Sequence, residues 1–76
     1  MEIHMARNVY RIVIGDKIKN YREKNSISQN TFGKMIGVSP QAVCKWEMGT
    51  SSPDIIMLPL LADILECSTD DFFEKQ

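Results

Sequence analysis

The fold is decided by residues 28–49, which read SQNTFGKMIGVSPQAVCKWEMG. Ser28 stands where a hydroxyl can accept a hydrogen bond from a free amide at the start of a helix. Gly37 stands where glycine, which adopts the left-handed conformation easily, ends one. Between them, apolar residues recur at helical spacing, so the sequence predicts a helix over 29–36.

A second set of the same signals follows at once. Ser39 is a candidate cap, Pro40 suits the first helical position because its missing amide costs nothing there, and Gly49 is a stop. They predict a helix over 40–48. Two short helices joined by so tight a connection form a helix-turn-helix, placed here at about residues 28–48.

Three further helices are predicted around this pair. Apolar residues from Ile14 onward form one stripe, and Asn25, which tolerates the left-handed conformation, is expected to end that helix. A fourth helix is expected to start near residue 57, with Pro59 in its first turn, where proline is tolerated; the alternative is a helix kinked at Pro59. Ser68 is expected to cap a last short helix.

The N-terminal end allows two interpretations. Residues 9–14 are rich in β-branched side chains and fit a strand, yet they also continue the stripe of the first helix. We therefore divide the chain into an N-terminal arm, 1–13, and a helix-turn-helix domain, 14–76. For His4 and Met5, a cloning scar is an alternative to a native part of the arm.

Composition excludes several classes of protein. Seventy-six residues make one domain at most, and no apolar run approaches the roughly 18 residues of a membrane-spanning helix. No secretory signal is evident, so we expect a cytoplasmic protein in which Cys44 and Cys67 are reduced. These cysteines and His4 lack metal-ligand spacing, so no metal site is expected.

The net charge of −1 argues against nucleic-acid binding only when the chain is taken whole. Residues 1–45 hold eight basic and three acidic side chains, a net charge of +5, whereas residues 46–76 hold one and seven, a net charge of −6. Charge asymmetry between halves is itself a nucleic-acid signal. The positive half holds most of the predicted helix-turn-helix.

Residues 28–54 follow the pattern SQxxFGxxIGVSxxxVxxWExGxxxPD, which resembles the Xre / Cro-type helix-turn-helix family, relatives of the lambdoid phage repressors. The resemblance covers about residues 14–73. It implies an all-α, compact five-helix lambda-repressor-like domain, usually a homodimer, that binds double-stranded DNA as a bacterial or phage transcriptional regulator.

The resemblance also implies roles for individual residues. The positions that match base-facing residues of the family are Pro40, Gln41, Ala42 and Lys45. The positions that match phosphate contacts are Gln29, Ser39, Thr50 and Ser51. Arg22 and Glu47 match a buried structural ion pair. Chemically, glutamine can read adenine and lysine can read guanine in the major groove.

Three positions depart from the family pattern. Ser26 stands where glycine is usual, Gly33 where alanine is more frequent, and Met48 where asparagine is common.

The leading hypothesis is a sequence-specific repressor whose third helix enters the major groove of a palindromic operator. The alternative is an antitoxin-like module that holds a protein partner and also binds its own operator. An enzyme ranks far lower, because the chain has no nucleophile–base pair, metal set or glycine-rich phosphate loop, and no cofactor is expected. Cys44, on the third helix, raises the separate hypothesis of a redox switch.

The dimer seam is expected on the last two helices. The residues considered for it are Met57, Leu60, Ile64 or Phe73, with the N-terminal arm as an additional candidate.

Overall fold

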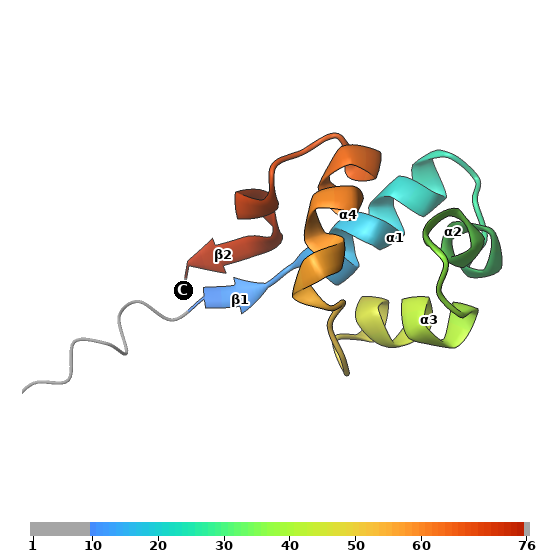
Figure 1. Ribbon diagram of the computed structural model, residues 1–76, viewed down its shortest axis with the longest axis horizontal. Coiled ribbons are helices and arrows are strands. Elements are labelled where there is room, and N and C mark those ends of the chain that lie inside the picture. Colours follow the sequence, from blue (N-terminus) through green and yellow to red (C-terminus); the bar gives the residue numbers. More distant parts are fainter. Residues whose placement is uncertain (1–9, 76) are drawn as a thin grey trace, which may run out of the picture.

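The computed structural model describes residues 10–75, which form four α-helices and a two-stranded antiparallel sheet made by the two ends of this segment (Figure 1). The helices are α1 (Ile14–Lys24), α2 (Gln29–Ile36), α3 (Pro40–Met48) and α4 (Leu58–Leu65). The strands are β1 (Tyr10–Ile12) and β2 (Phe73–Lys75). Two 3₁₀ turns, η2 (Ile55–Met57) and η3 (Thr69–Phe72), lead into α4 and β2. Among these residues, no helix is long and apolar enough to cross a membrane.

The bounds predicted for α2 and α3 are confirmed, because local chemistry sets them. The hydroxyls of Ser28 and Ser39 each accept a hydrogen bond from the third amide of their helix, at 3.0 and 3.1 Å. Gly37 and Gly49 end the helices in the left-handed conformation, with φ of 79° and 78°. α4 begins one residue before Pro59, which therefore lies in its first turn as predicted.

α1 ends at Lys24 with Asn25 as its C-cap, as expected, but Asn25 is not the left-handed residue. Asn25 has φ of −103°, and Ser26 takes the left-handed conformation instead, with φ of 57°. Ser26 is the position where the family usually has glycine, so the backbone here keeps a conformation for which serine is poorly suited.

The expected fifth helix is also wrong. Ser68 does act as a cap, but only one 3₁₀ turn follows, in which Phe72 is fully buried. The chain then leaves the turn as an extended strand, because β2 pairs antiparallel with β1 in the register Ile12↔Phe73. The amide of Val13 extends the pairing by donating to the carbonyl of Phe72 at 2.8 Å.

The sheet also answers the question left open for residues 9–14. Tyr10–Ile12 is a strand and α1 begins only at Ile14, so the strand interpretation is confirmed for these residues and the extension of the first helix is wrong. Residues 1–9 of the predicted arm, with His4 and Met5, lie outside the described residues.

One hydrophobic core joins the four α-helices and η3, whereas every residue of β1 and β2 is exposed. Its buried members are Ile14, Ile18, Phe32, Val43, Trp46, Leu61, Ala62 and Phe72. α1 lies directly on α3: a Cβ on Gly15 would stand 2.1 Å from the carbonyl oxygen of Trp46. The turn between α2 and α3 is similarly tight, since a Cβ on Gly33 would stand 2.5 Å from the carbonyl oxygen of Val38.

Candidate nucleic-acid interface

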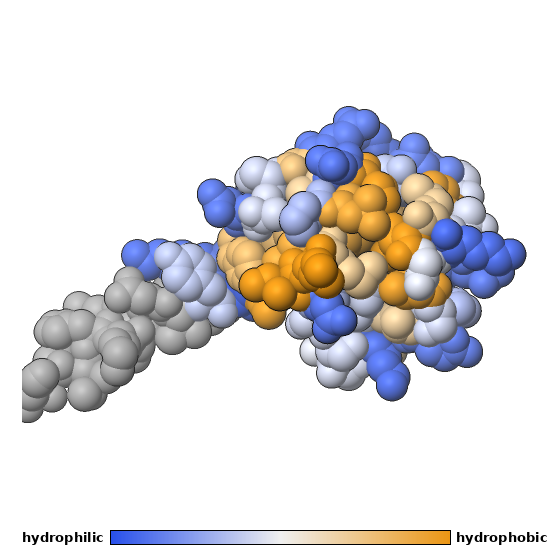
Figure 2. All heavy atoms as spheres, in the orientation of Figure 1, coloured by the Kyte–Doolittle hydropathy of each residue, from blue (hydrophilic) through white to orange (hydrophobic). Residues whose placement is uncertain are grey.

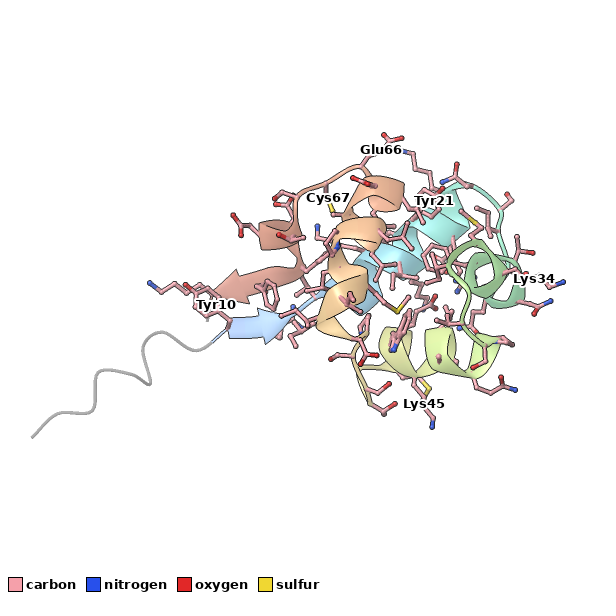
Figure 3. The ribbon with its side chains drawn as sticks, viewed as in Figure 1. Tyr10, Tyr21, Lys34, Lys45, Glu66 and Cys67 are labelled. Carbon is pink, nitrogen blue, oxygen red and sulfur yellow. The ribbon has the colours of Figure 1, made fainter. Side chains whose placement is uncertain are left out.

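α3 presents one face to the core and the opposite face to solvent. Val43 and Trp46 are buried against the other helices. Successive residues of an α-helix are rotated by about 100°, which places Gln41, Lys45 and Met48 on the far side of α3. All three are exposed. Figure 3 shows the Lys45 side chain pointing away from the body of the domain.

The four residues expected to face bases do not share one face. Gln41 and Lys45 lie together on the outward side, whereas Pro40 is half-buried at the first helical position. Ala42 is half-buried and packs against the core, so the structure turns it away from the outward side.

One outward residue, Met48, was not expected to face DNA bases. It shares the outward side of α3 with Gln41, Lys45 and Cys44, and the redox hypothesis already placed Cys44 near the DNA-binding surface. The Sγ atom of Cys44 lies 3.6 Å from the Sδ atom of Met48. Helical spacing identifies Met48, but the family pattern treated it only as a departure.

The predicted phosphate contacts gather at helix ends. Ser39 caps α3 and is exposed, and its hydroxyl hydrogen is free to turn toward solvent while the oxygen accepts from α3. Thr50 and Ser51, both exposed, follow the end of α3; the Thr50 hydroxyl donates to the carbonyl of Lys45 at 3.3 Å. Helix starts expose amides that lack intrahelical acceptors, which is a favourable environment for an anion.

Gln29, the fourth predicted phosphate contact, has its side chain engaged within the protein. Its Nε2 atom donates to Oε1 of Glu47 at 3.2 Å. What it offers to an anion in this geometry is its backbone amide at the first position of α2.

The structure brings Arg22 and Glu47 together in a two-bond pair. Nε of Arg22 donates to Oε2 of Glu47 at 2.6 Å, and Nη2 donates to Oε1 at 2.8 Å. Nη1 donates to the carbonyl of Ile27 at 3.0 Å. The side chains are only 14% and 6% exposed. With Gln29, this network connects α1, α2 and α3, and so holds the outward face of α3 at a set angle to the rest of the domain.

The electrostatics of the pair follow from this geometry. Burial on its own raises the pKa of Glu47, but hydrogen bonds from Arg22 and Gln29 and the positive charges of Arg22 and Lys19 together outweigh it, and the pKa is lowered. The hydrogen bond to Glu47 raises the pKa of Arg22 against the opposing effect of burial. Both groups are therefore held in their charged forms.

A helix-turn-helix family model matches residues 18–72. The chain belongs to the helix-turn-helix family of the Xre and lambda-repressor type. The repressor protein C2 of Salmonella phage P22 is 38% identical over 58 residues, which are 76% of this chain and 27% of that protein. A helix-turn-helix transcriptional regulator from the SPbeta prophage of Bacillus subtilis, YonR, is 33% identical over 58 residues, 54% of its own length. This helix-turn-helix chain thus spans about a quarter to a half of these relatives.

Two solved structures of the P22 repressor are similar to this helix-turn-helix domain. The crystal structure of the P22 c2 repressor in complex with a synthetic operator has a TM-score of 0.70 at 35% identity, covering 82% of this chain and 94% of that one. The solution structure of the repressor's DNA-binding domain has a TM-score of 0.66 at 37% identity and covers 79% of each chain.

Proposed function

We propose that this protein is a sequence-specific DNA-binding transcriptional repressor that inserts α3 into the major groove of its operator. In this role Gln41 reads adenine through two hydrogen bonds and Lys45 reads the acceptor atoms of guanine. The protein would bind DNA without catalysing a reaction, in the cellular compartment that contains the DNA.

The observation that carries the proposal is the outward face of α3. Gln41 and Lys45 are exposed, with Lys45 directed into solvent (Figure 3), on a helix whose other side is anchored in the core. Neither Gln41 nor Lys45 contributes to the core, so the stability of the fold does not explain why these residues are present. The similarity to a repressor solved in complex with its operator supports the same reading.

Phosphate contacts would set the position of α3 in the groove without selecting a sequence. The groups proposed for them are the Ser39 hydroxyl, the Gln29 amide and the segment of Thr50 and Ser51. All of them flank the outward face of α3, at the starts of α2 and α3 and just after the end of α3.

We further propose that the repressor is a homodimer, because two copies of α3 set about 34 Å apart would match a palindromic operator. The proposed contact is an exposed apolar surface, hereafter the isoleucine surface, made of Ile12, Ile55, Ile56, Leu60 and Phe73. Figure 2 shows hydrophobic side chains gathered over α4 and the turn that leads into it. Ile55 and Ile56 are each 82% exposed, which is unusual for neighbouring apolar residues with no partner.

This surface differs in part from the seam expected from the sequence. Leu60 and Phe73 are exposed, but Met57 and Ile64 are half-buried and pack against the core. A second copy is favoured as the occupant because the surface adjoins the end of α3: Ile12 lines one hollow together with Trp46 and Gly49, and a second together with Ile55 and Phe73. Pairing there would place the two α3 helices on either side of one dimer interface.

The DNA-binding test is selection of bound sites from a randomised duplex library, followed by titration of the selected operator. The variant Gln41→Ala/Lys45→Ala is expected to lose preference for that operator over a scrambled duplex. The matched control, Asn20→Ala/Lys24→Ala, removes the same two functional groups from the side of α1 that adjoins α4, and is expected to bind normally. Binding without sequence preference by the native protein would refute the proposal.

The dimer test is the mass in solution, measured by sedimentation. Ile55→Asp/Ile56→Asp is expected to convert a dimer into a monomer and to weaken binding to a full operator much more than to a half-site. A protein partner on the same surface, as in the antitoxin alternative, predicts a native protein that is already monomeric at high concentration.

A further inference from the structure

Half of the outward face of α3 is made of sulfur-containing side chains. Cys44 is half-buried, and Met48, one turn later, is 69% exposed. The Cys44 thiol approaches the Met48 thioether at 3.6 Å, so the two side chains pack against each other along the helix.

These sulfurs lie beside the proposed polar readers. With a rotation of about 100° per residue, Cys44, Met48, Gln41 and Lys45 follow one another around the helix within a sector of about 100°. The buried pair, Val43 and Trp46, lies on the opposite side. An α-helix that enters the major groove with Gln41 and Lys45 therefore brings Cys44 and Met48 into the same groove, where they face neighbouring base pairs.

The chemistry of the two sulfurs narrows what they can recognise. A thioether has no hydrogen to donate and accepts only weakly, and a thiol is weak in both roles. Neither sulfur can replace a water molecule that is hydrogen-bonded to a base without weakening the binding. Methionine is a polarisable, adaptable apolar group, and the C5-methyl of thymine is the apolar group that base pairs present in the major groove.

We propose that Cys44 and Met48 form a binding site for thymine C5-methyl groups, adding an apolar half to the readout by Gln41 and Lys45. The inference rests on the proposed function, because it requires α3 to lie in the major groove. It assigns this protein a requirement for T·A pairs beside the positions read by hydrogen bonds.

The test removes the methyl groups one at a time. In the selected operator each thymine is replaced by uracil, which differs from thymine only by that methyl. Uracil at one or two positions in each half-site is expected to weaken binding of the native protein by about fourfold per methyl, the effect of burying one such group. Met48→Leu keeps an apolar side chain and is expected to keep this sensitivity.

Variants that replace a sulfur by a polar group test whether the effect of uracil on binding depends on Cys44 and Met48. Met48→Gln and Cys44→Ser are expected to bind the thymine and uracil operators equally. The matched control is Met35→Gln, an exposed methionine on α2, which is expected to behave as the native protein. Thermal melts of each variant verify folding.

The possible outcomes separate the two proposals. Native protein that does not distinguish its selected operator from a scrambled duplex contradicts the proposed function. Specific binding that is unaffected by uracil at every position, or a uracil effect that persists in both Met48→Gln and Cys44→Ser, overturns the methyl site and leaves the function intact.

Discussion

Arg22 of α1 and Glu47 of α3 are joined by two parallel hydrogen bonds, of 2.6 and 2.8 Å, although 25 residues separate them in the sequence. Two-point contact between a guanidinium and a carboxylate sets orientation as well as distance. Because Gln29 of α2 donates to the same carboxylate, one acidic group holds together the three helices that form the proposed DNA-binding face.

Removal of the carboxylate is expected to be costly. Glu47→Ala leaves the Arg22 guanidinium buried without its counter-charge, which typically lowers the free energy of unfolding by about 3–5 kcal/mol. Urea unfolding measures the loss. The control is Glu74→Ala, which breaks the exposed pair between Arg11 and Glu74 and is expected to cost at most about 1 kcal/mol. Equal effects in the two variants would contradict a structural role for the buried pair.

The same pair predicts a dependence of stability on pH. The pKa of Glu47 is lower in the folded protein than its ordinary value of 4.5, so the carboxylate adds stability above pH 4.5. That contribution is lost as the pH falls below 4.5 and through the folded pKa. In urea titrations, the stability difference between the native protein and Glu47→Gln is expected to shrink over that range. A difference that stays constant from pH 7 to the acid limit would rule out this linkage.

Ser26 offers a stabilising substitution. Its φ of 57° is unfavourable for a residue with a Cβ but not for glycine. Ser26→Gly is therefore expected to raise the free energy of unfolding by about 0.5–1 kcal/mol. The control is Asn25→Gly at the neighbouring position, where φ is −103° and the side chain donates to the Tyr21 carbonyl at 2.8 Å. That variant is expected to lose stability, and thermal melts distinguish the two. A gain in stability from Asn25→Gly instead would show that Asn25, not Ser26, is the left-handed residue.

The contact between α1 and α3 predicts a strong effect of a single methyl group. Gly15→Ala forces the added Cβ against the Trp46 carbonyl oxygen, 2.1 Å away, and backbone must move to relieve it. We expect a loss of about 1–3 kcal/mol or more, as for overpacked cores. Asn20→Ala, at an exposed position of the same helix, is expected to stay within about 0.5 kcal/mol of the native protein. If Gly15→Ala has the same melting temperature as the native protein, α1 and α3 are farther apart than described.

The sequence was most informative where structure is decided within a few residues. Ser28 and Ser39 cap their helices, and Gly37 and Gly49 end them, so both helices of the helix-turn-helix could be predicted to the residue. That Gln41 and Lys45 share one side of their helix follows from the same local spacing. The left-handed residue after α1 was less predictable, because Asn25 and Ser26 are adjacent and the chain has no glycine there.

The rest depends on contacts between distant parts of the chain. The strand at Tyr10–Ile12 exists only because Phe73–Lys75 pairs with it from the other end, and no local pattern reports that pairing. The same pairing draws the chain away from a fifth helix. Gln29, expected at a phosphate, is held by Glu47 because packing brings α2 and α3 within hydrogen-bond reach.

By itself, then, the sequence determined the helix-turn-helix and its helix ends, since caps, glycines and helical spacing act over three or four residues. Only the tertiary structure decided which side of α3 is free. The core buries Val43 and Trp46 and draws in Ala42, so the exposed side is left to Gln41, Cys44, Lys45 and Met48. The physical reason is that a helix has one set of neighbours, and the side that packs against them fixes the side that can meet DNA.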